Sequence, residues 1–77
     1  MRKPNKDDLR ISANLKKFRL ASGLTQDEIV KKLEEEYSLV ISREQLSHYE
    51  NGKSRISAGL LQSLSSLFSI KISKFFN

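Results

Sequence analysis

A helix-starting pattern that occurs twice, at Thr25 and at Ser42, constrains the fold of this chain more than any other feature. In each copy the hydroxyl residue is followed three positions later by Glu28 or Gln45, which is the spacing of a capping box. Apolar residues also stand one position before and four positions after each hydroxyl residue, where they form a hydrophobic staple. The pattern therefore predicts two separate short helices that start at these two residues.

Helical spacing of apolar residues predicts further helices on both sides of this pair. Upstream, Asp7 or Asp8 is expected to cap a helix that ends at Gly23. Downstream, another helix is expected to begin after Ser57, and residues 70–76 are expected to turn into a short terminal helix. The inward faces are expected to carry Ile11, Leu15, Phe18, Ile29, Val30, Leu33, Tyr37, Leu46, Tyr49, Leu60, Leu61, Leu64, Leu67 and Phe68.

These elements predict an all-α fold, a compact bundle of four to five helices around one core. A chain of 77 residues holds a single domain, which at this size buries only about 60% of its unfolded surface. Residues 1–7 are polar and contain the only proline, so we expect a flexible basic N-terminal arm there. Residues 8–77 are expected to form the folded domain.

The composition argues against several classes of function. With no cysteine and one histidine, a zinc site is not expected, and we predict no metal and no cofactor. No apolar run approaches the roughly 20 residues of a membrane span, so we expect a soluble cytoplasmic protein. The chain also lacks a nucleophile paired with a base and a glycine-rich phosphate loop, so an enzyme is not predicted.

The net charge of +5 is distributed unevenly along the chain. Residues 1–24 carry seven basic and two acidic groups, and residues 42–77 carry five basic and two acidic groups. Residues 25–41 carry two basic and five acidic groups, so this middle segment would face away from a polyanion that the flanks contact. Charge alone fits equally well with a lysine surplus that keeps a small protein soluble.

Three motifs, in this order, resemble those of the phage repressor and Cro family, also called XRE-type helix-turn-helix proteins. They are residues 24–29 (LTQDEI), residues 49–53 (YENGK) and residues 69–76 (SIKISKFF). The resemblance implies a lambda-repressor-like bundle in which the helices starting at Thr25 and Ser42 form the helix-turn-helix. It also implies a prokaryotic or phage origin and double-stranded DNA as the partner.

The connection between these two helices is longer than is usual in the family. Thr25 and Ser42 lie 17 residues apart, and the glycine common in the family's turn is missing. The extra residues fall within 34–41, and because Tyr37 continues the apolar stripe, we expect the preceding helix to be lengthened. The residues after it are expected to fold back on the core: Leu39, Val40 and Ile41.

The helix that starts at Ser42 carries the side chains predicted to contact bases in the major groove. They are Arg43, Glu44, Gln45, Ser47 and His48. Arg43 suits guanine, Gln45 suits adenine, and Glu44 can accept a hydrogen bond from cytosine. By resemblance, Arg43, Glu44 and His48 match the family's main base-contacting positions. The alternatives are an ordinary solvated helix face, a pair between Glu44 and Arg43, and a buried, hydrogen-bonded His48 ring.

Four further residues are predicted to contact the DNA backbone. By resemblance, Gln26 binds a phosphate at the start of its helix, where backbone N–H groups and the helix dipole favour an anion. Asn51, Lys53 and Arg55 follow the base-contacting helix and are expected to hold the flanking backbone, which positions the protein without reading sequence.

Two structural contacts are also expected. By resemblance, Arg19 pairs with Glu50 and fixes the relation of two helices; the alternative is that Arg19 is a surface cation. Phe75 and Phe76 are adjacent, so one can fill the core while the other lies open. An open aromatic at this end suggests a dimer contact that includes Ile72, as the resemblance also implies. Core filling by both rings is the alternative.

The predicted function is sequence-specific binding of double-stranded DNA by a transcriptional regulator, in particular a repressor. The family resemblance implies a homodimer located with the nucleoid in the cytoplasm. The alternative is an antitoxin or another protein-interaction module with the same fold, which would bind a protein partner.

Overall fold

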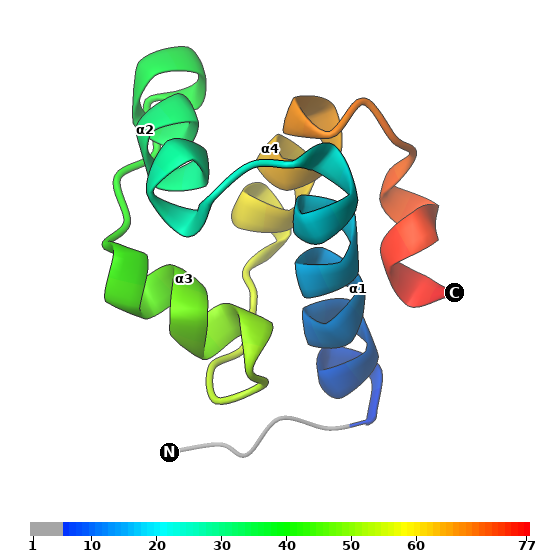
Figure 1. Cartoon of the computed structure of the whole chain (residues 1–77). Helices are drawn as coiled ribbons and strands as arrows, with labels where there is room; N and C mark the ends of the chain where they lie inside the picture. Colours follow the sequence, from blue (N-terminus) through cyan, green and yellow to red (C-terminus); the bar gives the residue numbers. More distant parts are fainter. Residues whose placement is uncertain (1–5) are drawn as a thin grey trace.

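The computed structural model describes residues 6–77, which form four α-helices and one short 3-10 helix (Figure 1). No strand occurs within this described range, so the all-α class predicted from the sequence is confirmed. The elements are α1 (Lys6–Ser22), α2 (Gln26–Tyr37), α3 (Arg43–Glu50), α4 (Ala58–Leu67) and the 3-10 helix η1 (Ile72–Phe76).

Both predicted capping boxes are present. The Thr25 hydroxyl accepts from the Glu28 backbone N–H at 3.1 Å, and the Glu28 carboxylate accepts from the Thr25 backbone N–H at 2.9 Å. At α3 the Ser42 hydroxyl accepts from the Gln45 N–H at 3.0 Å, and the Gln45 carbonyl accepts from the Ser42 N–H at 2.9 Å. The starts of α2 and α3 are thus fixed by local chemistry, since each box satisfies two backbone donors that the helix cannot.

The cap of α2 also affects an ionisable group. The hydrogen bond from the Thr25 backbone N–H, followed by that with the Thr25 side chain, holds the pKa of the Glu28 carboxyl below its ordinary value of 4.5. A lowered pKa in the folded state means that the charged carboxylate stabilises the fold. This stabilisation is complete above the ordinary pKa and is lost as the pH falls through the lower folded value.

The start of α1 differs from the prediction. The helix already includes Lys6 and Asp7, which we expected in the N-terminal arm, and Asp7 and Asp8 lie in its first turn instead of capping it. The physical reason is that carboxylates inside the first turn are favourable beside the positive end of the helix dipole, so a helix can begin before them. Residues 1–5, the rest of the predicted arm, lie outside the described residues.

The longer connection between α2 and α3 is folded only partly as expected. The helix ends at Tyr37, and Ser38 adopts a left-handed conformation with φ of 53°. Ile41 is buried and Leu39 is half-buried against the core. Val40 is 78% exposed, so the prediction that it folds back on the core is wrong. Because Leu39 and Ile41 on either side of it pack against the core, Val40 is left facing solvent.

The C-terminal segment packs against α1 through one aromatic ring and one amide. Phe75 is fully buried, and its ring meets that of Phe18 edge to face, with ring centroids 5.3 Å apart. The Asn14 side-chain amide donates to the backbone carbonyls of Phe75 at 2.8 Å and Asn77 at 2.9 Å. Helix η1 therefore lies beside α1 (Figure 1), and its fold depends on contacts from a distant part of the chain.

The core lies between all of these elements and consists of aliphatic side chains and one aromatic ring. The buried apolar residues are Ile11, Leu15, Ile29, Leu33, Ile41, Leu46, Leu60, Leu61, Leu64 and Phe75.

Two glycines terminate helices. Gly23 follows the end of α1 and Gly52 follows the end of α3, and both have a positive φ, which glycine adopts without a steric clash.

Candidate nucleic-acid interface

The residues predicted to contact bases lie along the outer side of α3. Arg43, Glu44 and Gln45 are exposed in its first turn, and Ser47 and His48 are half-buried further along. Gln45 has a structural role as well, because its carbonyl oxygen is the acceptor of the capping box. Arg43 and Glu44 make no contribution to that cap, and both are exposed at the start of α3.

A groove of about 590 Å³ runs between the starts of α2 and α3 and the side of α1. Arg43 and Ser47, predicted to contact bases, line it together with Gln26 and Asn51, predicted to contact phosphates. The Ser47 hydroxyl accepts a hydrogen bond from the Asn51 amide at 3.3 Å. The structure thus brings members of both predicted sets to one concave, polar surface.

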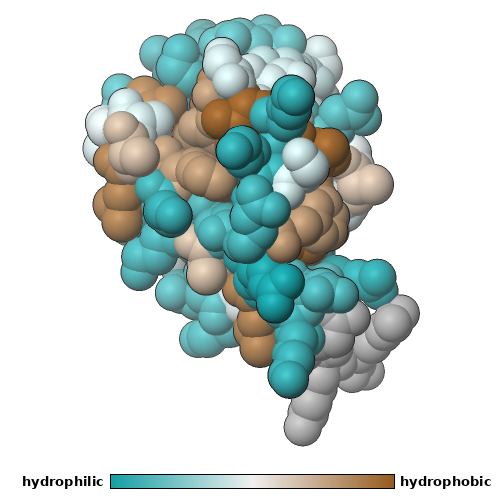
Figure 2. Space-filling view, turned by 90° about the vertical axis from the view of Figure 1, so that its right-hand side faces the viewer, coloured by the Kyte–Doolittle hydropathy of each residue, from teal (hydrophilic) through white to brown (hydrophobic). Residues whose placement is uncertain are grey.

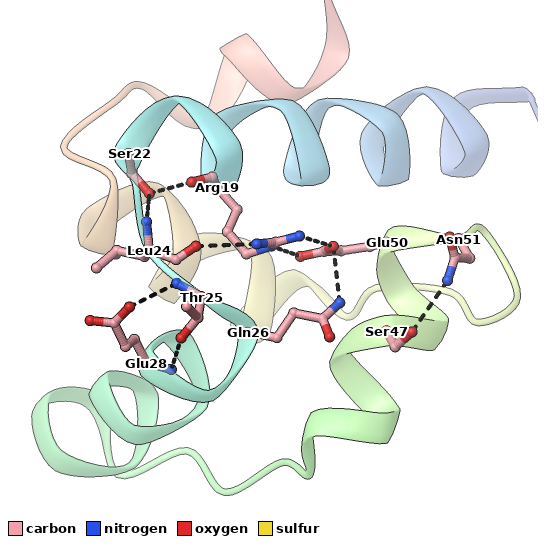
Figure 3. A network of polar contacts seen from close by, with 9 residues as sticks. All are labelled: Arg19, Ser22, Leu24, Thr25, Gln26, Glu28, Ser47, Glu50 and Asn51. Carbon is pink, nitrogen blue, oxygen red and sulfur yellow. Dashed lines mark hydrogen bonds and ion pairs between the residues drawn. The ribbon is translucent and has the colours of Figure 1, made fainter.

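A largely buried ion pair forms part of the lining of this groove. Arg19 Nε donates to Glu50 Oε2 at 2.6 Å, and Arg19 Nη2 donates to Glu50 Oε1 at 3.1 Å (Figure 3). Glu50 is only 5% exposed, and its Oε1 also accepts from the Gln26 amide at 3.2 Å. Arg19 Nη1 donates to the carbonyl of Leu24 at 3.1 Å. One network therefore ties α1 and the end of α3 to the start of α2, and it holds Gln26 in place.

Lys53 and Arg55 lie apart from this groove, in the connection that follows α3. Lys53 is exposed, and its backbone N–H donates to the carbonyl of His48 at 2.9 Å. Arg55 Nε lies 3.6 Å from a carboxylate oxygen of Asp8, so this predicted phosphate contact is attached to the first turn of α1. The residues predicted to contact the DNA backbone thus lie on both sides of α3. Gln26 lines the groove, and Lys53 and Arg55 follow the C-terminal end of α3.

Two residues of the groove were not singled out from the sequence, Asp27 and Lys16. Asp27 Oδ2 lies 3.6 Å from Arg43 Nη1. Lys16 stands three positions before Arg19 on α1, so it shares the face of that helix, and this spacing was an available signal. No such signal exists for Asp27, because its proximity to Arg43 results from how α2 and α3 pack.

Within residues 6–77, no group of three or more histidine, cysteine, aspartate or glutamate residues is placed to hold a metal ion. The same part of the chain contains no helix that is both long and apolar enough to cross a membrane.

The polar first turn of α3 lies beside the start of α2, and two consecutive helices with the second exposing its polar residues are typical of a helix-turn-helix protein. The model of the helix-turn-helix family matches residues 15–75, and the chain belongs to this family, of the XRE type. The resemblance stated from the three sequence motifs is thereby confirmed.

Relatives and one solved structure agree with this assignment. Two proteins described as uncharacterized HTH-type transcriptional regulators, from Sinorhizobium medicae (strain WSM419) and Rhizobium meliloti (strain 1021), are each 33% identical over 75 residues. These matches cover 97% of this chain and 50% of each relative, so the chain spans about half the length of these relatives. The solution structure of the SOS-response transcriptional repressor LexA from Eubacterium rectale superposes with a TM-score of 0.79 at 26% identity, covering 100% of this chain and 74% of that one.

Proposed function

We propose that this chain binds double-stranded DNA as a transcriptional regulator, with the first turns of α3 in the major groove. The observation that carries the proposal is the polar groove in which Arg43 and Ser47 stand beside Gln26 and Asn51. Contacts to DNA bases require side chains with hydrogen-bonding groups on one helix, and contacts to DNA phosphates require hydrogen-bond donors on both sides of that helix. That Arg43, Ser47, Gln26 and Asn51 line one groove supports the proposal.

The buried ion pair between Arg19 and Glu50 supports this function because it fixes the end of α3 against α1. A helix that reads bases must keep its position within a fraction of an ångström relative to the groups that hold the phosphates. Because Glu50 accepts from both Arg19 and Gln26, the end of α3 and the predicted phosphate contact share one anchor. The proposed interface is therefore preorganised before DNA arrives.

The proposal extends to a repressor that acts as a homodimer in the cytoplasm, associated with the nucleoid. A homodimer on a palindromic operator would bind half-sites about 34 Å apart, one turn of B-DNA. Phe76 is 47% exposed and Ile72 is exposed as well, so these two side chains are available for a dimer contact. Phe75 is not, because it is fully buried within the monomer. Figure 2, which faces the side where η1 lies in Figure 1, shows several apolar patches separated by polar side chains.

A second candidate, an antitoxin or other protein-interaction module, has one specific observation in its favour. Glu34, Glu35 and Glu36 are exposed near the end of α2. Val40, which is also exposed, follows them in the connection between α2 and α3, which is longer than usual in the family. A protein partner with a basic and apolar surface would complement this end of α2.

The proposed function is tested by two substitutions that separate base contact from phosphate contact. After an operator is selected from random duplex DNA, Arg43→Ala is expected to weaken operator binding by about 1–3 kcal/mol and to relax sequence preference at one position. Lys53→Ala is expected to weaken binding to all sequences alike and to reduce the salt slope by about one unit. The measurement is fluorescence anisotropy on operator and scrambled duplexes at several salt concentrations.

The matched control for Lys53 is Lys31→Ala, which removes the same charge from an exposed position on α2 that does not line the groove. If Arg43→Ala and Lys53→Ala both bind operator and scrambled DNA as Lys31→Ala and the unsubstituted chain do, α3 and the connection after it do not contact DNA, and the proposal fails.

A further inference from the structure

A carboxylate stands beside the residue that we assign to base contact. Asp27 lies in the first turn of α2, Arg43 is the first residue of α3, and Asp27 Oδ2 is 3.6 Å from Arg43 Nη1. Both residues line the same groove. A carboxylate on a surface that faces DNA phosphates is electrostatically unfavourable, so its presence there calls for a reason.

Stability of the fold is a poor explanation for this pair. The Arg43 side chain is 67% exposed and that of Asp27 is 72% exposed. Exposed ion pairs between flexible side chains contribute little to folding, and the Asp27 carboxylate would interact with the dipole of α2 wherever Arg43 pointed. The pair is therefore weak enough to be retained or released according to what binds in the groove.

The geometry of the guanidinium group offers a more specific role. Arginine has five N–H donors in a planar fork, and a guanine edge uses two of them for O6 and N7. The Asp27 carboxylate forms an ion pair with Arg43 at 3.6 Å, without a hydrogen bond; its attraction favours conformations of the long side chain in which one edge of the guanidinium faces Asp27 and the other donors point away from it. The same carboxylate repels phosphate, which is the other anion that a free arginine would bind.

We propose that Asp27 is a specificity-determining residue that orients Arg43 toward a guanine edge and keeps its guanidinium from pairing with a phosphate. This inference rests on the proposed function, because it presumes that α3 contacts DNA. It assigns to Asp27 a positioning role that acts through Arg43, with the carboxylate itself making no base contact.

The test compares selection profiles of variants from a pool of random duplexes. The position read by Arg43 is identified as the one that loses its preference in Arg43→Ala. In Asp27→Asn the preference at that same position is expected to fall about two- to fivefold, which is what an exposed ion pair can supply. Binding to scrambled DNA is expected to rise with a steeper salt dependence, since Arg43 is released toward phosphate and a negative charge is removed.

The control is Glu35→Gln, which removes the same charge from an exposed position on α2 outside the groove. It is expected to leave the selection profile unchanged. The double variant Asp27→Asn with Arg43→Ala is expected to show the profile of Arg43→Ala alone, because Asp27 acts only through that side chain. The melting temperature of Glu35→Gln is expected to match that of the unsubstituted chain, and that of Asp27→Asn is expected to be only slightly lower, because the Asp27 charge also interacts with the dipole of α2.

Three results would overturn the inference while leaving the proposed function intact: an Asp27→Asn profile equal to that of Glu35→Gln, a change in preference at a different position, or a selection profile of the double variant that differs from that of Arg43→Ala. If the unsubstituted chain selects no sequence, the proposed function fails, and the role of Asp27 fails with it.

Discussion

Replacing Arg19 with alanine is expected to reduce the free energy of unfolding by about 3–5 kcal/mol, because it leaves a buried carboxylate without its cation. The Glu50 side chain is 1% exposed in the folded chain, and the guanidinium donates two hydrogen bonds to it that the variant loses. The Gln26 amide would remain as a donor, but it carries no charge. For a domain of this size the loss is a large part of the total stability. Urea unfolding followed by circular dichroism measures it.

One further variant separates the charge of Arg19 from its geometry, and another serves as a control. Arg19→Lys keeps the charge but cannot form the two-pronged contact with Glu50, so an intermediate loss is expected. Arg43→Ala removes an arginine from an exposed ion pair and is expected to change the free energy of unfolding by less than about 0.5 kcal/mol. A neutral Arg19→Ala variant would mean that the ion pair does not hold α1 and α3 together.

Replacing Phe75 with alanine is expected to reduce the free energy of unfolding by about 3–5 kcal/mol through lost apolar burial and the cavity left behind. The ring is fully buried and packs edge to face on Phe18, so its removal also loosens η1 from α1. Thermal and urea unfolding measure the loss, and the carbonyl hydrogen bonds from Asn14 are not expected to compensate for it.

The adjacent residue supplies a matched control of the same type. Phe76 is 47% exposed, so Phe76→Ala is expected to lower the stability of the monomer by less than about 1 kcal/mol. Sedimentation of this variant also tests the proposed dimer contact. Equal losses in the two variants would contradict the assignment of Phe75 to the core and of Phe76 to the surface.

The helix starts were predictable because capping is local chemistry. Thr25 with Glu28 and Ser42 with Gln45 form their hydrogen bonds within four residues, so sequence spacing alone specifies them. The pairing of Arg19 with Glu50 was predicted from the family resemblance. These two residues are 31 positions apart, so no local spacing in the sequence connects them.

The parts that sequence could not predict depend on packing between distant elements. The position of Asp27 beside Arg43 follows from the approach of α2 and α3, and the attachment of the C-terminal carbonyls to Asn14 follows from the placement of η1. Val40 was misplaced because hydrophobicity favours burial but does not determine which side of a short connection each side chain faces. The start of α1 was misplaced because Asp stabilises both the cap and the first turn.

The central claim is that the surface around α3 binds double-stranded DNA, and it is tested most directly by titrating labelled random duplex DNA with this chain across a series of salt concentrations. Fluorescence anisotropy is expected to show binding whose logarithmic affinity falls linearly with the logarithm of salt concentration, by about 0.9 for each phosphate neutralised. A slope of several units would agree with backbone contacts from both sides of α3. No binding at low salt, or binding that does not respond to salt, would contradict the claim.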